Sequence, residues 1–208
     1  MATTTPNYGW TVPTSTDLVK DGATAIETLG DAIDASMNTA LGTKKAGMVL
    51  LNTTSFSAVA SQSINDVFST TYDNYRVVMN IAQTDAVGLN FRVRVGGSDL
   101  TSATYKWSRY FNNSNAGGYA SSNDNAASSI DIPGGISNRG FFVFDIGNPF
   151  NAFHTHVQLR SNFINGDGHS FNFTNSGSVN NTTSYTGFTI TAGSGTFTGT
   201  ISTFGVAK

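Results

Sequence analysis

The chain lacks several of the chemical groups that enzymes and secreted proteins commonly use. It contains no cysteine, which excludes disulfide bonds, thiolate nucleophiles and cysteine-ligated zinc. Its single glutamate is Glu27, so a pair of catalytic carboxylates would have to be built from aspartates. Charged residues make up 12% of the sequence, against about 25% in ordinary soluble proteins. We therefore expect a turn-rich structural protein whose stability depends on packing and on association between subunits.

Long apolar runs and basic clusters are missing as well. No apolar run exceeds four residues, as at 48–51, whereas a helix needs about 20 to span a bilayer. The first ten residues have neither the basic start nor the apolar centre of a secretion signal. The 11 lysines and arginines are spread thinly over 208 residues and form no positive surface in sequence. We predict no nucleic-acid partner, no membrane insertion and no conventional export.

The N-terminal segment combines an aperiodic arm with a helical seam. Residues 1–16 contain two of the four prolines and no periodic pattern, which predicts an extended arm. Over residues 17–45 an apolar seven-residue repeat appears. Its first positions are Val19, Ile26, Ile33 and Ala40, and Gly22, Leu29 and Ser36 follow three residues after the first three.

A helix over residues 17–45 is marginal alone, because each internal glycine costs roughly 1 kcal/mol relative to alanine. Its apolar stripe must pack on something. We predict a helical, coiled-coil-like oligomerisation stalk with Val19, Ile26, Leu29, Ile33 and Ala40 in the interface. The alternative is a single amphipathic helix lying against its own β domain. The residue types do not fix the number of helices.

Beyond residue 46 the apolar period changes from seven to two, as in half-buried strands. The expected strands cover residues 56–59, 76–81, 91–95, 104–111, 128–132, 140–146, 153–160, 170–174, 185–191 and 196–206. Turn residues separate them and no helical pattern intervenes, so we predict an antiparallel, jelly-roll-like β-sandwich over residues 46–208. Residues 112–129, which hold one aromatic and no other large apolar residue, are expected to form a surface loop.

None of the common catalytic patterns is present in the β domain. Asp124, Asp131, Asp145 and Asp167 fall in expected turns or exposed strand positions, where aspartate is ordinarily solvated. No nucleophile elbow or phosphate-binding loop lies in a suitable strand-to-helix context. We predict that the chain is not an enzyme, with no catalytic residues and no cofactor.

His154 and His156 are the one pair with metal-ligand spacing. Residues two apart on a strand face the same side, so both imidazoles could approach one metal, with further ligands from symmetry-related subunits. Two ordinary surface histidines are the commoner explanation, and we predict no metal site. Residues 165–168, Asn-Gly-Asp-Gly, lack the further carboxylates of a calcium loop and are expected to form a hairpin turn.

One expected strand carries closely spaced aromatic residues. Tyr105, Trp107, Arg109 and Phe111 share one face, and Lys106, Ser108 and Tyr110 share the other. Aromatic rings beside amides suit saccharides, whose rings have apolar faces and hydroxyl rims. If the first set belongs to the core, the candidates for receptor contact are Tyr110, Asn112, Asn113 and Tyr119.

Two segments carry a family resemblance. Residues 8–13 read YGWTVP and residues 16–23 read TDLVKDGA; residues 56–59, 64–68 and 72–77 read FSAV, INDVF and YDNYRV. Together these segments resemble the N-terminal arm, helix and first strands of tailed-bacteriophage fibre and minor virion proteins. The resemblance covers roughly residues 6 to 80. It implies a trimeric fibre attached through its N-terminus, usually to a tail or baseplate and sometimes to the capsid.

The expected function follows from that resemblance. The chain would be a homotrimeric tail fibre for host adhesion, located in the virion after assembly in the host bacterial cytoplasm. Tyr8 and Trp10 would attach the arm to other virion proteins, and the outer loops would meet a host-surface saccharide. The alternatives are a capsid decoration or cement protein and, with less support from the residues, a polysaccharide-degrading tailspike enzyme.

Overall fold

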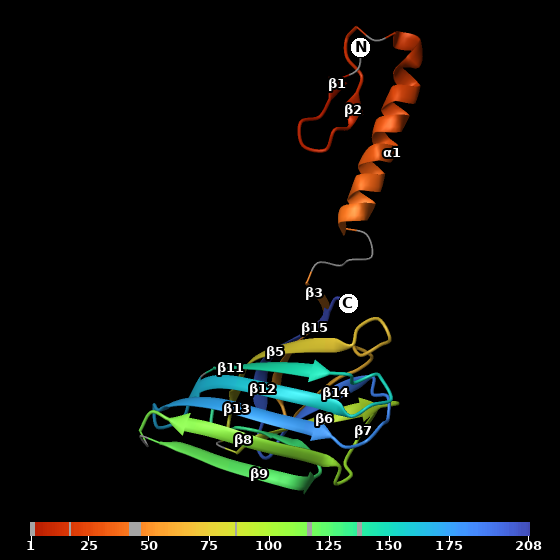
Figure 1. Ribbon diagram of the computed structural model, residues 1–208. Coiled ribbons are helices and arrows are strands. Elements are labelled where there is room, and N and C mark those ends of the chain that lie inside the picture. The colour runs from red at the N-terminus through yellow and green to blue at the C-terminus, as the bar shows by residue number, and fades with distance from the viewer. Residues whose placement is uncertain (1–2, 17, 42–46, 86, 116–117, 137–138) are drawn as a thin grey trace. The chain divides into compact units, whose positions relative to one another are not determined.

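The computed structural model describes residues 3–16, 18–41, 47–85, 87–115, 118–136 and 139–208 (Figure 1). The chain divides into two compact units, Met1–Gly47 and Met48–Lys208. Position 17 and positions 42–45, which the sequence assigns to the stalk, lie outside the described residues. No helix among the described residues is long and apolar enough to cross a membrane.

The N-terminal unit pairs a folded arm with a helix. The arm forms a small antiparallel ribbon of β1 (Thr3–Thr4) and β2 (Thr11–Val12). A 3-10 turn, η1 (Val19–Asp21), leads into α1 (Gly22–Leu41), and Leu18 is still extended. Regular α-helix therefore starts at Gly22, a residue of low helix propensity, directly after the 3-10 turn.

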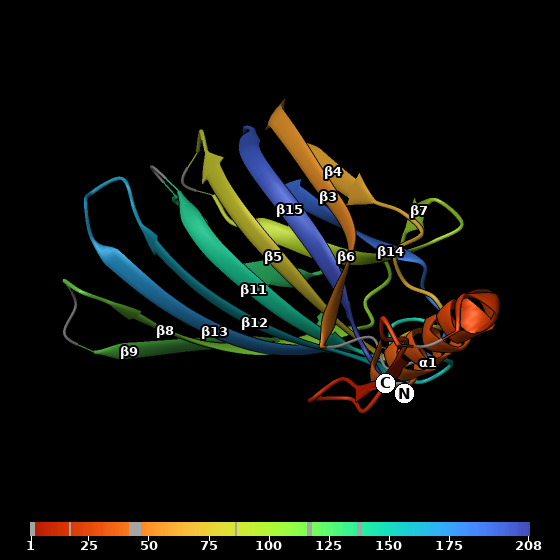
Figure 2. The same ribbon diagram turned by 90° about the horizontal axis from the view of Figure 1, so that it is seen from above.

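The β unit consists of two antiparallel sheets (Figure 2). The larger has eight strands in the order β3-β15-β5-β11-β12-β13-β8-β9. These strands are β3 (Met48–Val59), β15 (Phe197–Val206), β5 (Asn74–Gln83), β11 (Gly140–Gly147), β12 (Thr155–Ile164), β13 (Ser170–Val179), β8 (Tyr105–Asn113) and β9 (Tyr119–Ala127). The large number of neighbours that are distant in sequence is characteristic of a jelly-roll-like arrangement.

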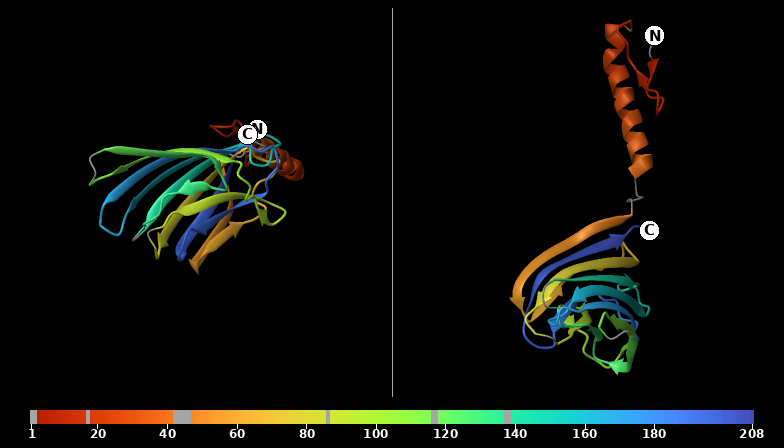
Figure 3. Two further views of the ribbon diagram at one scale, coloured as in Figure 1. Left: turned by 90° about the horizontal axis from the view of Figure 1, so that it is seen from below. Right: turned by 90° about the vertical axis from the view of Figure 1, so that its left-hand side faces the viewer.

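The smaller sheet has the order β10-β6-β14-β4, with β7 paired to β6. Its strands are β10 (Ile130–Ile132), β6 (Leu89–Val95), β14 (Gly187–Ala192), β4 (Ser61–Ile64) and β7 (Ser98–Asp99). It lies against one face of the larger sheet, which is strongly twisted (Figure 3). The prediction of a mainly β chain with an N-terminal helix and an antiparallel β-sandwich is confirmed.

Apolar residues at alternate positions fill the space between the sheets. In β5, Val77, Met79 and Ile81 are buried, as the two-residue period predicts. Stacked aromatic rings join the layers: Phe91 of the smaller sheet lies 5.7 Å from Phe144 of the larger sheet, between ring centroids. The core is therefore assembled mainly from the inward faces of the central strands, and the opposite face of the larger sheet is left to solvent.

The prediction of a loop over residues 112–129 is wrong. Residues 119–127 form β9, which pairs with β8 at the edge of the larger sheet. Nearly all of β9 is exposed on both faces, because the smaller sheet does not cover it. A strand in that position needs no large apolar residues, so the alternating pattern that marks half-buried strands is missing.

Candidate functional site

The uncovered face of the eight-stranded sheet is the most extended polar surface of the β unit. We call it the outer face and define it by the strand positions whose side chains point away from the core. From β11 to β9 it consists of Phe141, Val143 and Asp145; His156, Gln158, Arg160 and Asn162; Asn172, Thr174 and Ser176; Lys106, Ser108, Tyr110 and Asn112; and Tyr119, Ser121 and Asn123. These residues form rows that cross the strands.

One row places amide side chains between two aromatic rings. Phe141 pairs with Asn162, Asn162 with Asn172, Asn172 with Asn112, and Asn112 with Tyr119. The Asn162 Nδ2 donates to Asn172 Oδ1 at 2.7 Å, so the amides are ordered by each other. Phe141 and Tyr119 are both exposed, Tyr119 by 85%. We call this row the asparagine row.

The next row contains the tyrosine that the sequence singles out. Val143 pairs with Arg160, Arg160 with Thr174, Thr174 with Tyr110, and Tyr110 with Ser121. Tyr110 is 62% exposed, while the residues on either side of it in β8 turn toward the core. The Tyr110 ring is therefore accessible to a ligand on this polar surface.

Two arginines share one carboxylate at the β5 side of the outer face. Arg76 binds Asp145 through two hydrogen bonds, of 2.7 Å from Nε to Oδ1 and 3.1 Å from Nη2 to Oδ2. Arg160 Nη2 donates to the same Oδ2 at 3.1 Å. The hydrogen bond from Arg76 holds the pKa of the Asp145 carboxyl below its ordinary value, and Arg160 lowers it further. The group of three thus carries one net positive charge at neutral pH.

The outer face is hollowed in three places. One hollow of about 410 Å³ is lined by Arg76, Phe141, Val143, Arg160, Ser161 and Asn162. Another of about 410 Å³ lies over β5, β11, β12 and β13, and a third of about 500 Å³ over β12, β13, β8 and β9. His156, Ser176 and Gly177 line both of the latter two, so these hollows adjoin. All are open to solvent and suit a ligand that lies along the surface.

The structure brings together three of the four receptor-contact candidates. Tyr110, Asn112 and Tyr119 lie on the outer face of neighbouring strands. Asn113 points the other way, pairing with Phe171, and its Oδ1 accepts a hydrogen bond from the Asn115 backbone at 2.9 Å. It therefore shapes the turn between β8 and β9 and is not part of the same surface.

Sequence reasoning missed the other half of this face. Phe141, Arg160, Asn162 and Asn172 belong to strands that the sequence predicts at least in part, and their alternation already places them opposite the core. What the sequence does not show is the strand order, which sets β11, β12 and β13 beside β8. The alternation in β12 was the available signal, since each exposed residue there follows a buried one.

In the N-terminal unit, the arm folds back on the helix. The Trp10 ring stacks on Tyr8 with centroids 5.1 Å apart, and its Nε1 donates to the Ser36 hydroxyl at 2.9 Å. Trp10 is half-buried, whereas Tyr8 is exposed. The two proposed attachment residues therefore form one unit, of which Tyr8 offers the accessible face.

The predicted interface residues divide between two faces of α1. Leu29 is half-buried and shares a face with Gly22 and Ser36, which contact the arm or line the hollow beside it. Val19 and Ile26 are exposed by 96% and 65%. Together with their neighbours they form a largely exposed stripe at spacings of four and three residues, in which Ile33 is half-buried, and we call it the open stripe. It consists of Val19, Ala23, Ile26, Gly30, Ile33, Met37 and Ala40.

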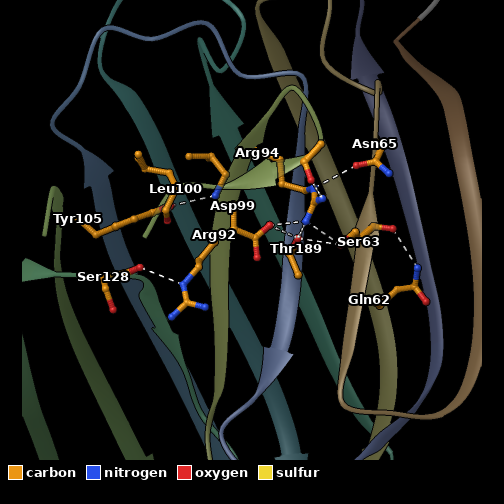
Figure 4. Close-up of polar contacts among 12 residues, drawn as sticks. Gln62, Ser63, Asn65, Arg92, Arg94, Asp99, Leu100, Tyr105, Ser128 and Thr189 are labelled. Atoms are coloured by element: carbon orange, nitrogen blue, oxygen red, sulfur yellow. Dashed lines mark hydrogen bonds and ion pairs between the residues drawn. The ribbon is translucent and has the colours of Figure 1, made fainter. Parts of the chain in front are cut away.

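A polar network on the far side of the sandwich is structural in character (Figure 4). Arg94 donates to the Ser63 hydroxyl at 2.8 Å, to the Thr189 hydroxyl at 2.7 Å and to Asn65 Oδ1 at 3.0 Å, and it also binds Asp99 and the Gly97 carbonyl. One guanidinium thereby links β4, β14 and the turn between β6 and β7. Because its donors are directed at the protein itself, this network stabilises the smaller sheet rather than offering a ligand site.

The aspartates considered for catalysis have structural partners. Asp131 is ion-paired with Arg109, and Asp145 with Arg76 and Arg160. Asp124 Oδ1 accepts from the Ala126 backbone, and Asp167 belongs to the turn at residues 165–168. A carboxyl whose pKa is lowered, as in Asp145, is unsuited to donate a proton as a general acid.

The two histidines do not share a strand. His156 lies on the outer face of β12, and His154 precedes that strand. Among the described residues, no group of three or more His, Asp or Glu side chains could hold a metal ion within one chain. The expectation that His154 and His156 are ordinary histidines without a metal stays a prediction for the assembled subunits.

The Asp145 ion pairs predict a specific acid dependence of stability. Since folding lowers the pKa of this carboxyl, its contribution is complete above the ordinary value of 3.8 and is lost as pH falls below it toward the folded pKa. Asp145→Asn should therefore reduce the free energy of unfolding at neutral pH. On acidification, the free energy of unfolding of this variant should fall less than that of the unchanged protein. Urea unfolding along a pH series measures this. Arg76→Gln should likewise weaken the decrease in the free energy of unfolding at acidic pH. The same decrease in both variants as in the unchanged protein would contradict the assignment.

Comparisons with known proteins add little to this geometry. No family model matches the sequence, and no curated protein matches it. Among solved structures, the galectin LEC-6 of Caenorhabditis elegans is similar over 78% of this chain and 96% of its own, with 9% identity and a TM-score of 0.32. A likeness of that size carries no inference about ligand or function.

Proposed function

We propose that this chain is the subunit of a homotrimeric bacteriophage tail fibre, a non-enzymatic adhesion protein of the virion. The arm with Tyr8 and Trp10 attaches to other virion proteins, the helices hold the subunits together, and the β-sandwiches meet the host surface. The resemblance of residues 8–23 and 56–77 to fibre and minor virion proteins supports the phage assignment.

The open stripe is the observation that carries the proposal. Seven residues at spacings of four and three repeat the period of a coiled-coil seam, and all seven are apolar or glycine. The arm already contacts the other apolar side of α1, so the stripe needs a different partner. A 20-residue helix that starts at Gly22 and has Gly30 inside it is marginal without one. A second and third copy of the same helix provide the same stripe in return, as rotational symmetry requires.

The β unit supports an adhesive role through its outer face. Exposed aromatic rings, amides and hydroxyls lie on a rigid sheet, where they are held without the entropy that a mobile loop would lose on binding. Contacts of this kind are weak one at a time. Linking three such faces makes the second and third contacts intramolecular, which raises the overall affinity without new interactions.

The trimer predicts a specific response to charge on the open stripe. Ile26→Asp combined with Ile33→Asp places buried, unpaired carboxylates along the proposed seam, so the subunits should separate. By light scattering, the mass should fall from three times 21.9 kDa to 21.9 kDa. Circular dichroism of the same samples should show an intact β unit, because its core lies in residues 48–208.

The matched control adds the same two charges away from the stripe. Thr24 and Asn38 are exposed on α1 outside the open stripe, so Thr24→Asp with Asn38→Asp should leave the trimer intact. Dissociation of both variants alike would indicate a general effect of charge on the helix and would overturn the assigned seam. If the unchanged protein is itself monomeric, the fibre proposal fails and the capsid decoration alternative takes its place.

A further inference from the structure

The hollow beside Phe141 combines three features that a ligand could use. It has an exposed aromatic ring, a pair of guanidinium groups and an exposed amide, from Phe141, Arg76 and Arg160, and Asn162. Its volume is about 410 Å³, within the range that small-ligand sites occupy. The sequence as a whole carries a net charge of −2, so the excess of positive charge here is local.

Arg160 is the residue with donors to spare. Its side chain is 61% exposed and, within the described residues, donates one hydrogen bond, from Nη2 to Asp145 Oδ2. Arg76, by contrast, uses two nitrogens on the same carboxylate. Asp145 therefore orients both guanidinium groups while cancelling the charge of one of them. The remaining positive charge lies nearer Arg160, where a carboxylate or sulfate could accept two parallel hydrogen bonds.

The surface continues from this hollow along the asparagine row. Four inter-strand spacings separate Phe141 on β11 from Tyr119 on β9, a span of roughly 19 Å. Amides cover the interval, and Tyr110 lies in the neighbouring row. Apolar rings suit the faces of sugar units, and amides suit their hydroxyl groups. A ligand that uses the whole row must be extended, polar and several units long.

We propose that the outer face binds an extended acidic saccharide, with one carboxylate or sulfate group on Arg160 and neighbouring sugar rings along Phe141 and the asparagine row. This inference rests on the proposed adhesive function and names its ligand class. No bond is made or broken. The Phe141 ring packs on a sugar face, Arg160 donates to the anionic group, and Asn162 and Asn172 contact hydroxyls.

The test uses the full chain and defined oligosaccharides in isothermal titration calorimetry. The acidic probes are tetragalacturonate, a sialic-acid tetramer and a heparin tetrasaccharide; the uncharged probes are maltotetraose and the methyl ester of tetragalacturonate. At least one acidic probe should bind, and both uncharged probes should bind at least about tenfold more weakly than it does, as expected for loss of charge-assisted hydrogen bonds. Failure of all three acidic probes would overturn the proposal.

Two single substitutions locate the site. Arg160→Gln should raise the dissociation constant for the acidic probe about tenfold or more. Arg92→Gln removes the same charge from the smaller sheet, on the other side of the sandwich, and should leave the constant unchanged. Equal loss in both variants would show a general charge effect and contradict the site.

Other outcomes separate this inference from the proposed function. If neutral and acidic probes bind equally and Phe141→Ala abolishes both, the outer face is an adhesive surface without an anion site, and the inference alone fails. If inorganic sulfate competes at the same concentration as the oligosaccharide, Arg160 binds free anions, and the inference also fails. The oligomeric state, which light scattering tests, is independent of either result.

Discussion

Phe91→Ala is expected to lower the free energy of unfolding of the β unit by about 3–5 kcal/mol. Phe91 is fully buried and stacks on Phe188 of its own sheet at 5.6 Å and on Phe144 of the opposite sheet at 5.7 Å. Phe188 in turn stacks on Phe68 at 5.9 Å. Removing the middle ring leaves a cavity where the two layers meet, and rigid strands on both sides prevent the site from collapsing.

Phe141→Ala is the matched control for that experiment. The same ring is removed, but Phe141 is exposed on the outer face and supports no contact between the sheets. Its effect should be no more than about 1 kcal/mol. Urea unfolding followed by circular dichroism compares the two. An equal loss of unfolding free energy in both variants would mean that the stacked rings around Phe91 do not hold the two sheets together. Phe141→Ala thereby separates stability from the ligand contact proposed for this ring.

A second large decrease in the free energy of unfolding is expected from Gly199→Ala. Gly199 lies in β15, in the interior of the larger sheet between β3 and β5, next to an irregularity in the pairing with β3. A methyl group there would overlap the backbone carbonyl oxygen of Asn80 and would lie 2.8 Å from the Cα of Ile81. Neither atom belongs to a side chain that could rotate away. Strands β15 and β5 must separate locally, at a cost of about 3 kcal/mol or more.

Gly166→Ala tests whether the loss at Gly199 comes from crowding. Gly166 lies in the turn between β12 and β13, and a methyl group there would meet no atom within 4 Å. The midpoint of urea unfolding should therefore change little. A small effect at both positions would mean that β15 can move away from β5 without loss, contrary to its place in the sheet interior.

Local patterns in the sequence were enough to predict the fold class and most strands. The alternation of Val77, Met79 and Ile81 reports burial directly, because one side of β5 packs against the core. The edge strand β9 was missed because neither of its faces is covered, and Ser, Asn and Ala suffice there. A two-residue period marks a strand only where one face is buried and the other is not.

The candidate site was predicted in part for a different reason. Tyr110, Asn112 and Tyr119 lie within ten residues of one another, so sequence proximity was a fair guide to them. Arg160 and Phe141 join them through the order β11-β12-β13-β8-β9, and that order depends on contacts between segments far apart in the chain. Asn113, one residue from Asn112, points to the other face for the simple reason that strands alternate.

The apolar seven-residue repeat of the helix can be completed by either of two sets of companion residues. Val19, Ile26 and Ile33 are flanked on one side by Gly22, Leu29 and Ser36, and on the other by Ala23, Gly30 and Met37. Both sets fit a seam. The arm, which has no periodic pattern, binds the first set at Ser36, through a hydrogen bond from the Trp10 indole to the Ser36 hydroxyl. The open stripe is the apolar side of α1 that the arm does not contact.

The position of β15 between β3 and β5 sets an order of events during synthesis. The larger sheet cannot close until residue 206 has left the ribosome, whereas α1 is complete by residue 41. At ribosomal rates the interval is on the order of ten seconds. In the proposed trimer, helices on neighbouring nascent chains of one messenger would therefore meet before any sandwich is finished. Each β domain would then mature while already tethered to its partners.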